Sequence, residues 1–143
     1  MITNEVQYRS TKAHLAKFEE AAANLEARRD RSKLGELELE AVRAQADDLR
    51  SEIAEYELLR SGTVSSFDAS SLSDLAVLLV KARIARGWTQ RQLADALGVA
   101  EQQVQRYEST GYRAASLARI CDVAAALGVT VTERAVLRNP DAA

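Results

Sequence analysis

Polar side chains that can read base pairs are concentrated in one short segment, residues 101–109. A helix there would turn Val104 and Tyr107 inward. Its outer face would then carry Glu101, Gln102, Gln103, Gln105 and Arg106. A Gln amide can form a bidentate hydrogen-bond pair with adenine, and an Arg guanidinium can do so with guanine. A merely solvated helix more often carries Glu and Lys pairs, so we expect this face to contact base edges in the major groove of double-stranded DNA.

The segment just before it has the sequence of a short helix followed by a sharp turn. Thr89 can cap this helix, Ala94 allows a second helix to cross it closely, and Gly98 can adopt the left-handed conformation that ends it. Gln90 and Arg91, at its start, are placed to hold a phosphate, helped by the free backbone N–H groups of the first turn. The two segments together predict a helix-turn-helix.

The charge distribution supports this placement, although the chain has a net charge of -2 at pH 7. Residues 1–61 hold ten basic and thirteen acidic residues, whereas residues 81–119 hold seven basic and three acidic ones. Positive charge is therefore concentrated around the expected reading helix, where the phosphate backbone of DNA would lie.

The N-terminal part has the repeat of two long helices, each with a narrow apolar seam. The first seam consists of Tyr8, Thr11, Leu15, Phe18, Ala22 and Leu25, and the second of Leu39, Val42, Ala46, Leu49, Ile53 and Tyr56. Alternating steps of three and four residues are what a coiled coil requires. A charged stretch at 28–35, ending in Gly35, predicts a turn and hence an antiparallel hairpin. One uninterrupted helix that dimerises in parallel is the alternative.

Composition separates the chain into two units. Ser and Gly are frequent at residues 62–71, which predicts a linker between a helical hairpin at 1–61 and a DNA-binding domain at 72–143. With one Pro and few aromatic residues, we expect an all-α protein.

Within the second unit we expect five helices, the first capped by Ser73 and the last at residues 115–127. Alternating apolar residues at 129–137 would allow a short C-terminal strand, best paired with the same strand of a second subunit.

The remaining reactive residues give no sign of catalysis. His14 is the only histidine and is expected in solvent, and Cys121 is expected as a buried, inert thiol. No nucleophile and base, metal-ligand cluster or cofactor loop stands in a credible context, so we expect no enzyme, no cofactor and no metal. The absence of a signal peptide or membrane span predicts a cytoplasmic, nucleoid-associated protein.

The segment from residue 72 to 129 resembles the Cro and lambda-repressor type of helix-turn-helix, also called Xre-like. The strongest parts of the match are Arg83-Ile84-Ala85-Arg86-Gly87-Trp88-Thr89-Gln90, Leu93-Ala94, Leu97-Gly98-Val99 and Arg106-Tyr107-Glu108.

The resemblance assigns roles to several of these residues. It implies a structural ion pair between Arg83 and Glu108, and a phosphate contact by Gln90. It also implies base reading by Gln102 and Arg106, and a position near the DNA backbone for residues 110–113, which include Tyr112 and Arg113. Ala100 departs from the pattern, because the family usually has a Ser or Thr cap there, which by capping energetics is worth about 1 kcal/mol.

Two functions follow as expectations. The first is a homodimeric transcriptional regulator, an autoregulating repressor on a palindromic operator. The second comes from the whole-chain pattern, which resembles Xre-type regulators that act as HigA-like antitoxins. In that alternative the N-terminal helices would neutralise a toxin protein.

Overall fold

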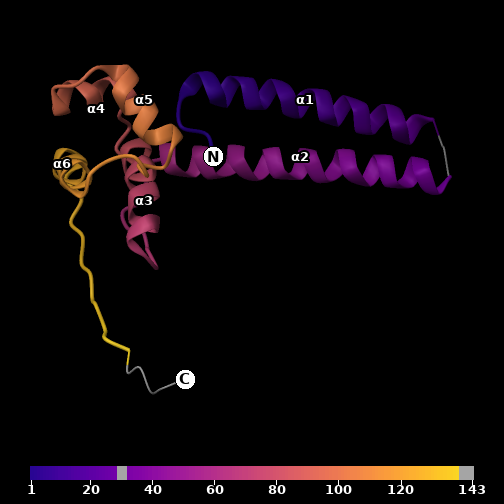
Figure 1. The fold of residues 1–143 in the computed structure, drawn as a ribbon. Coiled ribbons are helices and arrows are strands. Elements are labelled where there is room, and N and C mark those ends of the chain that lie inside the picture. Colours follow the sequence, from indigo (N-terminus) through magenta and orange to yellow (C-terminus); the bar gives the residue numbers. More distant parts are fainter. Residues whose placement is uncertain (29–31, 139–143) are drawn as a thin grey trace.

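The computed structural model describes residues 1–28 and 32–138 and is all-α, as the sequence predicts. Its helices are α1 (Glu5–Ala27), α2 (Lys33–Arg60), α3 (Leu72–Ala85), α4 (Gln90–Leu97), α5 (Glu101–Ser109) and α6 (Leu117–Leu127) (Figure 1). None of these helices combines the length and apolar character needed to cross a membrane.

The first two helices run antiparallel and form a long hairpin that projects from the rest of the molecule (Figure 1). The structure therefore has the predicted antiparallel hairpin, and not the alternative of one uninterrupted N-terminal helix. All twelve seam residues are buried or half-buried, because each helix covers the seam of the other. The expected turn at 28–35 lies partly outside the described residues. The prediction that Gly35 ends this turn is wrong, because Gly35 lies inside α2. Its backbone N–H donates to the hydroxyl of Ser32, the N-cap of α2, at 3.1 Å.

Polar contacts tie the two helices together along the hairpin surface. Arg50 reaches Glu19 across the hairpin at 2.9 Å, and Arg60 reaches Glu5 at 2.7 Å. The Tyr8 ring lies 5.2 Å from that of Tyr56 between ring centres. Such exposed ion pairs contribute little each, so the seam supplies most of the stability.

Up to residue 138, the C-terminal unit contains four helices, α3 to α6, and not the expected five. Residues 110–114 form turns, and α3 is capped by Ser71, whose hydroxyl accepts the Asp74 N–H at 3.1 Å, in place of Ser73. The expected strand is also absent up to residue 138. A strand needs a partner for its hydrogen bonds, and the described part of the chain contains none.

The base of the hairpin shares one hydrophobic core with the C-terminal unit. Ile53 and Leu59 of α2 belong to the same buried cluster as Leu79 of α3, and the Lys81 ammonium lies 2.6 Å from the Glu55 carboxylate. This shared packing fixes the hairpin base relative to the helices that follow.

Candidate nucleic-acid interface

Local sequence chemistry sets the corner between α4 and α5. Thr89 and Gln92 form a reciprocal capping box at the start of α4, with bonds of 3.1 and 2.8 Å. Gly98 ends α4 with φ of 67°, a left-handed conformation that favours glycine. Ala94 is buried between the helices, which leaves α5 packed across α4 with one face in solvent.

The outer face of α5 is free to contact a ligand. The exposed side chains of Glu101, Gln102, Gln105 and Arg106 make no hydrogen bond or ion pair within the described chain, and Gln103 is half-buried. On either side of α5 along the sequence, Arg91 and Arg113 are likewise exposed and free of such contacts among the described residues. Two exposed guanidinium groups therefore flank, along the chain, a helix whose outer face carries amide and guanidinium donors.

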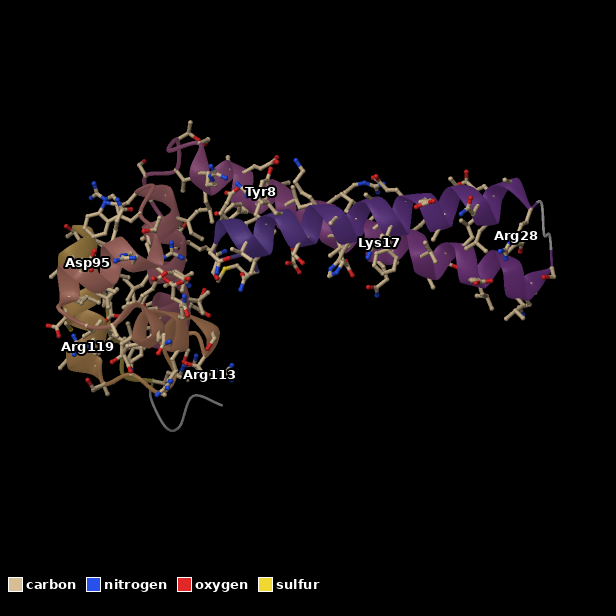
Figure 2. All side chains as sticks on the ribbon, turned by 90° about the horizontal axis from the view of Figure 1, so that it is seen from above. Tyr8, Lys17, Arg28, Asp95, Arg113 and Arg119 are labelled. Carbon is tan, nitrogen blue, oxygen red and sulfur yellow. The ribbon has the colours of Figure 1, made fainter. Side chains whose placement is uncertain are left out.

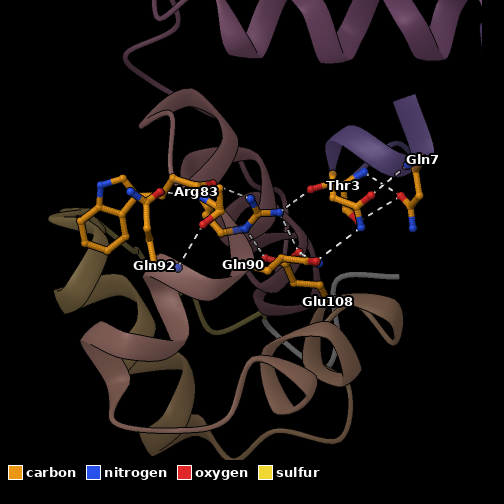
Figure 3. Close-up of polar contacts among 9 residues, drawn as sticks. Thr3, Gln7, Arg83, Gln90, Gln92 and Glu108 are labelled. Carbon is orange, nitrogen blue, oxygen red and sulfur yellow. Dashed lines mark hydrogen bonds and ion pairs between the residues drawn. The ribbon is translucent and has the colours of Figure 1, made fainter. Parts of the chain in front are cut away.

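Behind this face lies a buried ion pair between Arg83 and Glu108, which are 2% and 4% exposed (Figure 3). The Arg83 Nε and Nη2 atoms donate to the two carboxylate oxygens at 2.5 and 2.8 Å. Arg83 also donates to the carbonyl of Trp88 at 2.7 Å and to that of Thr3 at 2.6 Å. These are the residues that the resemblance pairs, and their contact ties α3 to the end of α5.

Gln90 lies in the same network and not on the surface, which corrects the expected phosphate contact of its side chain. It is only 6% exposed. Its Nε2 donates to Glu108 at 2.7 Å, and its Oε1 accepts from Asn4 at 3.4 Å. Because both ends of the amide are engaged, this side chain positions α4 against α5.

The predicted DNA contact of Tyr112 is also corrected, because this side chain is only 1% exposed and lies in the core. Its φ of 59° turns the ring inward, where it stacks on Tyr107 at 5.8 Å between ring centres. The buried hydroxyl has no hydrogen-bond partner among the described residues. Burial raises the pKa of this hydroxyl far above its ordinary value, and the nearby Glu108 carboxylate adds to the shift.

The N-terminal residues join this network although sequence reasoning did not include them. Ile2 is buried in the core, and Thr3 and Asn4 reach Arg83 and Gln90 (Figure 3). The sequence does contain one signal for this arrangement. Asn4 is a favourable N-cap residue, and it indicates that the first helix begins at Glu5.

The other residues with reactive side chains lie apart from this site. His14 is exposed on α1, and Trp88 packs half-buried against the core. Cys121 is exposed, which corrects the expected buried thiol. α6 turns Val123 and Leu127 inward, so a residue at position 121 faces solvent.

Comparison with known families agrees with this geometry. Residues 79–134 match a family model described as helix-turn-helix, a segment that contains all of α4, α5 and α6. No curated protein and no solved structure matches the chain. Residues 79–134 thus carry a helix-turn-helix of the Xre or lambda-repressor type, and this match supports DNA binding and transcription regulation in general.

Proposed function

We propose that this protein is a homodimeric transcriptional regulator that lays α5 of each subunit in the major groove of a palindromic operator. The observation that carries the proposal is the outer face of α5, where Gln102, Gln105 and Arg106 are exposed without partners among the described residues. Donors of this kind make bidentate contacts with adenine and guanine.

Phosphate contacts would come from both ends of the helix pair. Arg91 and Arg113 supply exposed positive charge, while the backbone N–H groups of Gln90 and Arg91 open the first turn of α4. The backbone therefore offers the phosphate contact that the buried Gln90 side chain cannot. Glu101 would repel a phosphate, which favours a role for it at a base edge.

Dimerisation follows from the symmetry of such sites. Two copies related by a twofold axis would read half-sites about one helical turn apart and double the number of phosphate contacts. Occupying an operator is enough to exclude polymerase, so we propose repression of the protein's own gene as its mode of action, within the nucleoid. In this proposal the domain of residues 72–143 binds DNA. Residues 1–61 form the dimer interface or bind a partner protein, and residues 62–71 connect the two parts.

The test is a salt-titrated mobility shift on the DNA upstream of the gene, against scrambled DNA of equal length. Arg106→Ala should cost about 1–3 kcal/mol and relax specificity at one operator position. Arg113→Ala should weaken binding to all sequences and reduce the salt slope by about one phosphate contact. Arg9→Ala on the hairpin is the matched control. Equal binding to both DNAs, or a uniform loss in Arg106→Ala, would overturn base reading by α5.

A second candidate function is favoured by the shape of the molecule. The hairpin projects away from the DNA-reading helices, and its tip at Arg28 lies at the opposite end from Arg113 and Arg119 (Figure 2). We propose that this arm binds a protein partner, as an antitoxin would bind its toxin, while the other end remains on DNA.

A further inference from the structure

We infer that the outer face of α2 near the hairpin tip is a docking site for a cationic amphipathic helix of a partner protein. The face is defined by Leu34, Leu37, Ala41 and Ala44, and is called the outer stripe below. The inference rests on the proposed role of the hairpin in protein binding and is independent of DNA binding.

The outer stripe repeats the spacing of a helix-packing surface but has nothing packed on it. Its members are separated by three, four and three residues, the same steps as in the seam on the other side of α2. All four are exposed, with Leu34 at 77% and Leu37 at 53%. The α1 helix cannot cover them because it occupies the seam. The α2 helix thus has two apolar faces, of which one has no partner within residues 1–28 and 32–138.

Acidic side chains outnumber basic ones around the outer stripe, where Lys33 is the exposed cation beside Leu34. Glu36 and Glu40 lie along one side and Glu38 along the other, all exposed and without an ion pair among the described residues. The neighbouring Arg43 is already engaged by Glu26, and Asp47 by Arg50. Residues 33–48 hold five acidic and two basic residues, so the rim of the stripe is acidic.

These charges decide which partner fits. A second copy of α2 would bring two acidic rims together, and DNA would be repelled in the same way. A helix with apolar residues at heptad spacing and Lys or Arg beside them would bury the stripe and neutralise its rim. A shallow hollow, lined by Glu36, Leu39, Glu40, Arg43, Ala44 and Asp47, borders the stripe at Ala44 and would receive one side chain of the partner helix. Because the tip is remote from α5 (Figure 1), both surfaces can be occupied together.

The test uses a synthetic helical peptide with Leu at heptad positions a and d and Lys at e and g. Its binding to the full chain is measured by fluorescence anisotropy, beside a peptide with Glu at e and g. The Lys peptide should bind at least about tenfold more tightly than the Glu peptide. The double variant Leu34→Gln/Leu37→Gln should weaken Lys-peptide binding by about tenfold or more. The control Val6→Gln, an equally exposed apolar position on α1, should bind as the wild type does.

Several results would overturn the inference. They are equal affinity for the two peptides, no loss in the double variant, or an equal loss in Val6→Gln. Dissociation of a dimer by the double variant in sedimentation would show that the stripe joins two copies of this chain instead. Operator binding measured on the same samples separates the proposals, since operator binding without peptide binding overturns the docking site alone.

Discussion

Replacing Arg83 by Met is expected to destabilise the protein strongly, because it leaves the Glu108 carboxylate buried without its cation. Arg83 makes four hydrogen bonds, two to Glu108 and one each to the carbonyls of Trp88 and Thr3. In the variant, only Gln90 would still donate to the carboxylate. Removing one partner of such a buried pair costs about 3–5 kcal/mol. For a protein of this size, that corresponds to a Tm lower by roughly 10–20 °C.

The reverse change, Glu108→Leu, is expected to cost less. The Arg83 guanidinium would keep its bonds to two carbonyl groups, so part of its charge remains solvated by the protein. The double variant Arg83→Met/Glu108→Leu should lower the free energy of unfolding by about as much as one of the single substitutions, because it leaves neither charge buried without its partner. This non-additivity predicts a coupling energy of roughly 2–3 kcal/mol.

Urea unfolding followed by circular dichroism measures these differences through the midpoint and the slope. Arg9→Met is the control, since Arg9 pairs with Glu5 on the exposed surface of α1 and should change stability by less than about 0.5 kcal/mol. If Arg83→Met cost no more than this control, or if the two single costs simply added, the reasoning from burial would be wrong.

Three further predictions concern single residues. Tyr112→Phe should stabilise the protein by about 1 kcal/mol, since the hydroxyl is buried without a hydrogen-bond partner in the described part of the chain. The raised pKa of Tyr112 should also make the unfolding free energy fall above about pH 10, where only the unfolded chain ionises, by up to about 1.4 kcal/mol per pH unit. Urea titrations of the two proteins at pH 8–11 should therefore show a steeper loss in the wild type, and parallel curves would contradict this. Ala100→Ser should add about 1 kcal/mol, because α5 has no side-chain cap. Ala96→Ser inside α4 should give no gain. Cys121 should react with a thiol reagent in the native protein nearly as fast as in urea, and protection of the native thiol would contradict its exposure.

Local patterns predicted most of the fold correctly. The two heptad seams depend only on the spacing of apolar residues along each helix, and all twelve seam residues are buried or half-buried in the hairpin. The corner between α4 and α5 depends on Thr89 and Gly98, whose capping and left-handed conformation are properties of a few adjacent residues. The presence of these elements could therefore be inferred without tertiary contacts.

Residues whose roles depend on distant parts of the chain could not be placed in this way. The buried Gln90 side chain accepts a hydrogen bond from Asn4, which is 86 positions away, and no periodicity relates the two. Tyr112 turns inward through a left-handed φ that tyrosine rarely adopts. On α6 nearly every residue is apolar or small, so the sequence pattern does not define which face is buried, and the prediction of a buried Cys121 is wrong.

The N-terminal segment links the hairpin to the helix-turn-helix at the start of α4 and the end of α5. Thr3 accepts from the same guanidinium that holds Glu108, and Asn4 donates to Gln90. With Ile2 buried in the shared core, rotation of the hairpin base would break these contacts together, because close-packed interiors do not deform continuously. A partner bound at the remote tip can shift operator affinity only if it prefers a different position of this base. Without such a preference, docking at the tip and reading of the operator are independent events.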